Sequence, residues 1–143
     1  MNRFLIDTDI LSYYFKGDPD VVRKFNTYLD QFDLIEISLV TYYEIISGLL
    51  AKNALKQLAV FEDFVAGNRI LPLTEKSLKI SAELYSTLRH SGKTLDDMDL
   101  FIAGVAIENE MTLVTNNENH FGRIPGLIID NWKKNTYPGV ETE

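Results

Sequence analysis

Short apolar runs alternate with longer amphipathic segments along most of the chain. The short runs are typical of strands and lie at residues 3–7, 34–37, 70–73, 112–115 and 127–129. The longer segments predict helices at residues 8–15, 19–30, 39–50, 54–65, 75–90 and 95–109. This alternation predicts a three-layer α/β sandwich, in which a mostly parallel sheet of about five strands carries helices on both faces.

Capping residues mark where several of these helices begin. Ser38 and Thr74 each precede a helical segment and are good N-cap residues. Thr94, with Asp97 three residues later, has the spacing of a capping box and predicts that the next helix begins directly after it. These signals place the first turns of three helices.

The length and composition fit one domain. The chain has 143 residues without an internal repeat or linker, so we expect a domain at residues 1–134 and a loose tail at residues 135–143. It has no cysteine, which excludes a disulfide scaffold and thiolate zinc sites and agrees with a reducing cytoplasm. No apolar run approaches the roughly 20 residues of a membrane span, and no signal segment precedes the first strand. We therefore expect a cytoplasmic protein without membrane contact.

Three acidic residues lie at positions next to buried segments. Asp7 ends the first strand, Glu44 lies inside the apolar stretch 39–50, and Asp99 leads into the apolar run 100–107. Ligands of open α/β sheets bind at the carboxyl ends of the strands. Because Asp7 lies at this edge and the other two acids follow helix starts near it, the three carboxylates are expected to meet there.

Converging carboxylates need a compensating charge. A carboxylate next to a buried segment is unfavourable unless its charge is offset, and this chain has only two histidines. A hard divalent cation, Mg²⁺ or Mn²⁺, prefers oxygen ligands and provides that offset. Each acid taken alone also fits a common structural role, as a helix-dipole or capping residue or on a solvated helix face. Their joint placement favours a metal-dependent enzyme.

Small residues follow Asp99 along its helix. Ala103, Gly104 and Ala106 leave room for that helix to approach the sheet closely, which would shorten the distance from Asp99 to Asp7.

The net charge is −7, from 21 acidic and 14 basic residues. This balance argues against a nucleic-acid partner, because affinity for phosphates comes from Lys and Arg. A bound divalent ion would weaken the objection, and an acidic surface also suits a basic protein partner. A basic rim in the N-terminal half is available from Lys16, Arg23, Lys24, Lys52 and Lys56.

Four segments together resemble PIN-domain proteins and, more narrowly, the VapC toxins of type II toxin–antitoxin modules. They are FLIDTDILSYYFKGD (4–18), VTYYEIISGL (40–49), DLFIAGVAIENEMTLVTNN (99–117) and HFGRIPGLIIDNW (120–132). The resemblance covers nearly the whole chain and is weakest at residues 51–94. It implies a Mg²⁺-dependent endoribonuclease that cleaves RNA, with tRNA, and the anticodon region of initiator tRNA, as the expected substrate. It also implies a homodimer and inhibition by a cognate antitoxin whose basic tail reaches the acidic pocket.

The resemblance assigns site residues one position at a time. It makes Asp7, Glu44 and Asp99 the catalytic and metal-binding acids, and Thr8 a supporting hydroxyl.

A fourth acid is frequent in the family just after the fourth strand. This chain has Asn117 there, preceded by Thr115 and Asn116, so the three residues are supporting candidates and the fourth acidic ligand is missing. An amide oxygen still accepts from a metal-bound water. With one negative charge fewer, a second metal ion would bind more weakly.

Two other functions remain open from the sequence. The run that ends Asp7-Thr8-Asp9 also fits a phosphotransferase of the haloacid-dehalogenase type, with Asp7 as nucleophile and Asp9 as acid or base. A PIN-like fold that binds RNA without cleaving it is the second alternative.

The two histidines are not expected to be catalytic. His90 ends a helix and suits a charge role there. His120 follows Asn117 by three residues and has a structural or RNA-contact role in this interpretation. Phe121 and Trp132 are expected to pack at the sheet edge.

Overall fold

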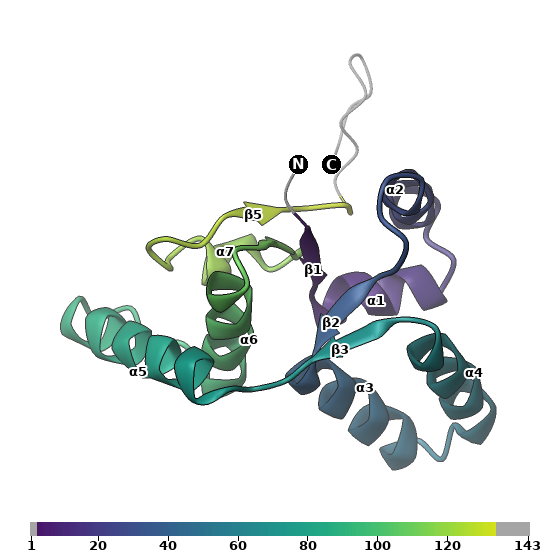
Figure 1. The fold of residues 1–143 in the computed structure, drawn as a ribbon. Coiled ribbons are helices and arrows are strands. Elements are labelled where there is room, and N and C mark those ends of the chain that lie inside the picture. Colours follow the sequence, from purple (N-terminus) through teal and green to yellow (C-terminus); the bar gives the residue numbers. More distant parts are fainter. Residues whose placement is uncertain (1–2, 134–143) are drawn as a thin grey trace.

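Five parallel strands form the central sheet of the computed structural model, which describes residues 3–133 (Figure 1). The strands are β1 (Phe4–Ile6), β2 (Glu36–Ser38), β3 (Arg69–Leu71), β4 (Thr112–Val114) and β5 (Ile129–Asp130). Their spatial order is β3-β2-β1-β4-β5. The predicted parallel sheet is confirmed, although each of the five strands differs from its predicted range by one or two residues at one or both ends. The prediction of a tail at residues 135–143 lies outside the described residues.

Helices cover both faces of the sheet, as the alternation predicts. One side carries α1 (Thr8–Phe15), α2 (Pro19–Leu29), α3 (Leu39–Ala51) and α4 (Leu55–Ala66) (Figure 1). The other side carries α5 (Glu75–His90), α6 (Asp97–Glu108) and the short α7 (Glu118–Phe121), which the sequence does not predict. Within residues 3–133, no helix is long and apolar enough to cross a bilayer.

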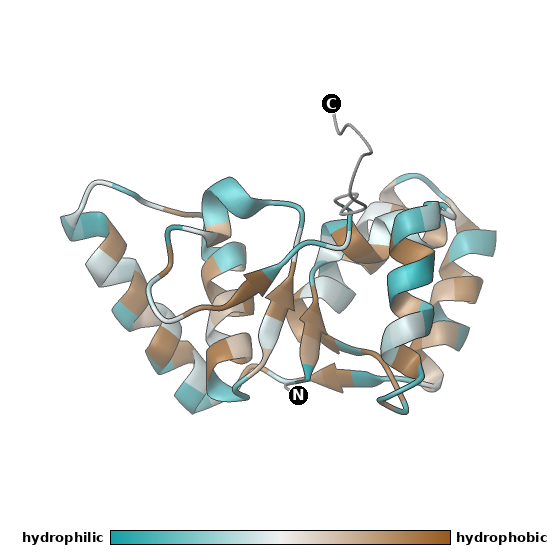
Figure 2. Ribbon diagram, turned by 90° about the horizontal axis from the view of Figure 1, so that it is seen from above, coloured by the Kyte–Doolittle hydropathy of each residue, from teal (hydrophilic) through white to brown (hydrophobic). Residues whose placement is uncertain are grey.

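Two apolar cores follow from the alternation of side chains along the strands. Leu5 and Leu113 face the core beneath α5 and α6, whereas Ile6 and Val114 face the core beneath α1 and α2. The brown strands between the helical layers in Figure 2 show this buried apolar centre. Trp132 belongs to the second core, so its predicted packing role is confirmed.

The helix starts agree with the sequence at two of three places. The Ser38 side chain accepts a hydrogen bond from Thr41 N, and Thr74 forms a capping box with Ser77. The capping box predicted at Thr94 is wrong, because α6 begins at Asp97 and has no side-chain cap. Asp99 therefore lies in the first turn of α6.

The close approach that Gly104 permits is between helices, which corrects the expectation that it brings α6 to the sheet. A Cβ atom on Gly104 would overlap Ser81 Oγ and the Ser77 carbonyl of α5. Ser81 Oγ also donates to the Leu100 carbonyl at 2.7 Å. The helix that carries Asp99 is thus fixed against α5.

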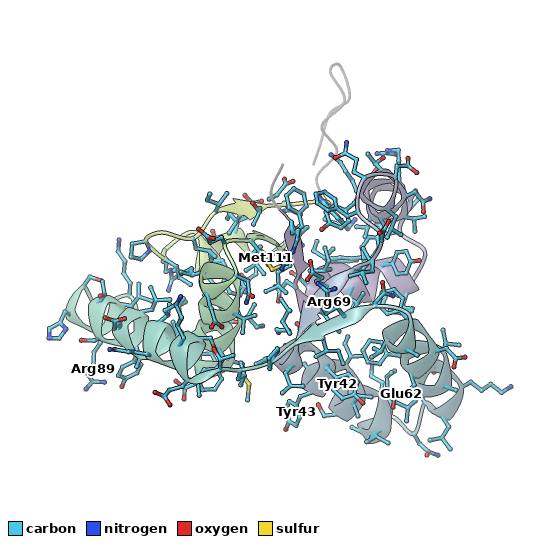
Figure 3. The ribbon with its side chains drawn as sticks, viewed as in Figure 1. Tyr42, Tyr43, Glu62, Arg69, Arg89 and Met111 are labelled. Carbon is cyan, nitrogen blue, oxygen red and sulfur yellow. The ribbon has the colours of Figure 1, made fainter. Side chains whose placement is uncertain are left out.

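A buried ion cluster lies at the amino edge of the sheet. Glu36 is 2% exposed and accepts hydrogen bonds from Arg3 Nε at 2.8 Å and from Arg69 Nη1 at 3.2 Å. Figure 3 labels Arg69, and the Arg3 guanidinium also contacts Met111 Sδ. Arg3, just before β1, and Arg69, at the start of β3, therefore neutralise this buried carboxylate of β2.

Candidate active site

Asp7 occupies the first position after β1, at the carboxyl edge of the sheet. It is the N-cap of α1, with Oδ1 accepting from Thr8 N at 2.8 Å. Its other oxygen, Oδ2, accepts from Thr115 Oγ1 at 2.7 Å, and the residue is only 6% exposed. The carboxylate is therefore held in one orientation by the residues that follow β1 and β4.

Burial raises the pKa of Asp7 to about 8. The negative charge of Asp9 is the second cause, and Asp99 adds to it, while the hydrogen bonds from Thr115 and Thr8 lower the pKa. No cationic side chain within residues 3–133 pairs with Asp7, whereas Glu36, which is also buried, has two arginines. Asp7 is thus a buried acid that lacks a compensating positive charge.

Glu44 reaches the same region through Thr8. Thr8 Oγ1 donates to Glu44 Oε1 at 2.6 Å and lies 2.9 Å from Thr41 Oγ1. Because the single Thr8 hydroxyl proton goes to Glu44, Thr41 is the donor in the second contact. The residue directly after Asp7 therefore fixes the carboxylate of Glu44 on α3.

Asp99 and His120 approach each other from α6 and α7. Asp99 Oδ2 lies 3.2 Å from His120 Nδ1, and Asn117 Nδ2 lies 2.9 Å from the same ring nitrogen. Burial raises the pKa of Asp99, and its contact with His120 lowers it. His120 thus contacts a site acid directly, and its position three residues after Asn117 was the only sequence signal for this.

The loop after β4 connects the two sides of the site. Asn117 N donates to Thr115 Oγ1 at 3.0 Å, and Thr115 in turn holds Asp7. Asn117 also contacts His120, which contacts Asp99. A continuous series of polar contacts therefore runs from Asp7 to Asp99 through the loop that carries the predicted supporting residues.

Asp9 is a further acid near the site that the metal interpretation of the sequence left out. Its Oδ2 accepts from Asn116 N at 3.1 Å and its Oδ1 from Ile10 N at 2.7 Å. Burial is the main cause that raises the pKa of Asp9. Asn116 Oδ1 accepts in turn from Asn131 Nδ2 at 2.9 Å. Asp9 therefore ties α1 to the loop after β4.

The donor set fits a hydrated hard cation. The expected meeting of the Asp7, Glu44 and Asp99 carboxylates as one direct ligand cluster is not found, because within the described part of the chain no three Asp, Glu, His or Cys side chains are close enough to hold an ion together. Mg²⁺ usually keeps several waters and takes only one or two carboxylates directly. Asp7 has no cationic partner among the described residues, and the charge of Asp99 acts on it, so these two acids suit direct ligation. Glu44 suits contact through water.

Comparisons with known proteins support one family. The family model described as PIN domain matches residues 4–127. Ribonuclease VapC2 of Rickettsia felis is 31% identical over 132 residues, which cover 92% of this chain and 98% of that protein. The tRNA(fMet)-specific endonuclease VapC of Salmonella typhimurium is 30% identical over 136 residues, with 92% and 99% covered.

Solved structures agree with these relatives. The VapBC2 complex of Rickettsia felis bound to a promoter DNA fragment has a TM-score of 0.81 at 30% identity, covering 90% of this chain and 98% of that one. The DNA-bound VapBC of Salmonella typhimurium has a TM-score of 0.82 at 29% identity, covering 92% and 99%. These matches decide against the haloacid-dehalogenase alternative. The chain belongs to the PIN-domain family and, within it, to the VapC ribonucleases.

Proposed function

We propose that this chain is a VapC-type toxin that hydrolyses RNA phosphodiester bonds with Mg²⁺, or alternatively Mn²⁺, as its cofactor. The observation that carries the proposal is the buried carboxylate of Asp7. It lies at the carboxyl edge of the sheet without a cationic partner among residues 3–133, while Asp99 and Glu44 approach from two other helices. A protein that keeps an uncompensated acid in this position loses stability unless a cation binds there.

Asp7 and Asp99 would hold the ion, and Glu44 would contact it through water. A bound divalent ion lowers the pKa of a coordinated water and neutralises charge at the scissile phosphate. Glu44 accepts from Thr8 through Oε1, which leaves its other oxygen available to orient the attacking water and take its proton. Thr115 keeps Asp7 oriented, and Asn117, in place of a fourth acid, contributes no charge.

The substrate and partners follow from the relatives. One relative acts on tRNA(fMet) according to its name, so we propose initiator tRNA, cut in its anticodon region, as the substrate. Relatives also form VapBC complexes, so a VapB-type antitoxin is the proposed inhibitor. The active form is proposed to be a homodimer in the cytoplasm without membrane contact. The net charge of −7 complements a basic antitoxin tail.

Cleavage of RNA by the purified chain tests the proposal. An initiator tRNA transcript is incubated with the protein in Mg²⁺, in Mn²⁺ and in EDTA, and the products are mapped on a sequencing gel. We expect cleavage with either ion and none in EDTA. Asp99→Asn should abolish cleavage, whereas Asp63→Asn, which removes an exposed acid of α4, should not.

Two results would contradict the proposal in different ways. If the transcript is bound but stays intact in both ions, the chain is a PIN-like binding protein and not a nuclease. If cleavage persists in EDTA, or in the Asp99→Asn variant, the assigned metal site is wrong.

A further inference from the structure

A groove of about 550 Å³ lies beside the acidic site, between α1, α3 and α4. Thr8 and Glu44 line its wall, and the same two residues form the 2.6 Å contact that positions the Glu44 carboxylate. The groove is therefore continuous with the proposed active site. The three helices lie on one side of the sheet in Figure 1.

The floor of the groove is apolar. Ile45 and Leu49 of α3 and Phe61 of α4 line it, and Phe15 at the end of α1 is 38% exposed. Away from the groove, Tyr42 of α3 donates to Glu62 of α4 at 3.1 Å, so the two helices are also held together by a polar contact (Figure 3). The groove is thus a formed feature with an accessible aromatic side chain.

Three lysines line the groove, at the helix ends remote from the acids. Lys16 follows the last residue of α1, Lys52 follows the last residue of α3, and Lys56 lies in the first turn of α4. All three are exposed, and no ion pair within residues 3–133 involves them.

The two kinds of charge are separated along the groove. Lys52 follows Glu44 by eight residues on α3, and Lys16 follows Thr8 by eight residues on α1. At 1.5 Å per helical residue, each pair is separated by about 12 Å along its helix. The groove therefore runs from the Glu44 carboxylate at one end to ammonium groups at the other.

We propose that this groove binds the RNA strand next to the scissile phosphate, an inference that rests on the function proposed above. The neighbouring phosphates contact Lys16, Lys52 and Lys56, and a base lies against Phe15 and the apolar floor. The strand enters from the acidic end, where the scissile phosphate lies at the metal site.

The charge of the whole protein makes such a contact necessary. With a net charge of −7, the surface repels RNA on average, so binding requires local cations along the path of the strand. The divalent ion supplies them at one end of the groove and the lysines at the other. A peptide in the same groove would need acidic side chains at the lysines and a basic side chain at Glu44. An RNA strand carries only negative charge, and it satisfies both ends of the groove once the divalent ion is bound.

A double variant tests the proposal against a matched control. Lys52→Gln/Lys56→Gln removes two groove charges, and Lys76→Gln/Lys79→Gln removes two exposed charges from α5, on the other side of the sheet. Both are made in the Asp99→Asn background, so that a fluorescein-labelled initiator tRNA transcript stays intact while its Kd is measured in Mg²⁺ at several NaCl concentrations. All four positions are exposed, and circular dichroism checks the fold.

The groove variant should bind the transcript at least about tenfold more weakly at low salt, and the slope of log K against log salt should fall by about 1.4, or 0.7 for each lost phosphate contact. In the α5 variant, the Kd and the salt slope should differ from those of the parent protein by much less. In the active background, the groove variant should raise KM and leave kcat within about twofold, because the lysines lie away from the reacting atoms.

The proposal is overturned if the groove variant and the α5 variant have the same Kd and salt slope. It is also overturned if the groove variant keeps full RNA affinity but no longer binds the antitoxin, since the groove is then a protein-docking surface. Cleavage by the wild type is scored separately. A wild type that binds RNA through the lysines without cleaving it would refute the nuclease function and support the groove.

Discussion

Replacing Asp7 by Asn should stabilise the metal-free protein while it abolishes activity. The pKa of Asp7 rises from 3.8 to about 8 in the folded chain, chiefly through burial. The folded state therefore binds a proton that the unfolded state releases between these two values, and the free energy of unfolding falls as pH rises from about 4 to about 8. Asparagine carries no charge at any of these pH values, so the Asp7→Asn variant does not lose this free energy of unfolding as the pH rises.

The structure sets the size of the effect. A shift of about four pH units, fully expressed, corresponds to about 5–6 kcal/mol at pH 8, and this is an upper bound. Asn fits the same position, because its Oδ1 can accept from Thr8 N and its Nδ2 can donate to Thr115 Oγ1. Entry of water around the ionised acid reduces the effect. We therefore expect the free energy of unfolding of Asp7→Asn to exceed that of the wild type by at least about 1 kcal/mol at pH 7.5 and by almost nothing at pH 4.

Urea denaturation in EDTA, followed by circular dichroism between pH 4 and 8.5, measures this difference. Asp63→Asn serves as the control, because it removes the same charge from an exposed position on α4. Adding Mg²⁺ should stabilise the wild type in proportion to the logarithm of its concentration and leave Asp7→Asn unchanged.

The reasoning is refuted if Asp7→Asn is no more stable than the wild type at pH 7.5 without metal. It is equally refuted if its advantage is the same at pH 4 as at pH 8, because the gain would then have no connection with ionisation of the acid.

Three further substitutions test the contacts around the site. Glu44→Gln keeps an acceptor for the Thr8 hydroxyl but loses the base, so kcat for RNA cleavage should fall by about 100-fold or more with the Kd for RNA unchanged. Thr115→Val removes the hydroxyl that orients Asp7 and should lower the free energy of unfolding by about 1–2 kcal/mol in urea titrations. Asn131→Ala removes the hydrogen bonds from Asn131 to Asn116 and Glu118 that hold the loop after β4, so the Mg²⁺ concentration for half-maximal cleavage should rise. An unchanged concentration would mean that the loop needs no such support.

The sequence predicts the sheet and most of the helices because the apolar pattern alone specifies them. The start of α6 was misplaced because Thr94 and Asp97 have capping-box spacing, and such spacing does not guarantee the turn. The short α7 was missed, since four residues carry too little periodicity to stand out.

The sequence predicts those site residues that directly follow the end of a strand. Asp7 follows directly from the end of β1, and the loop at Thr115 from the end of β4. The contact between Thr8 and Glu44 joins residues 36 positions apart and depends on how α3 packs against α1, which periodicity does not encode. The same is true of His120 and Asp99, because their contact required the unpredicted α7.

The attachment of α6 to α5 extends the region on which activity depends. Ser77 and Ser81 contribute nothing to the acidic edge. They contact Gly104 and the Leu100 carbonyl, however, and thereby fix the position of α6, the helix that carries Asp99. In a genetic selection for cells that survive expression of this chain, inactivating changes should therefore appear along α5 as well as among the acids. Such survivors would still possess every carboxylate.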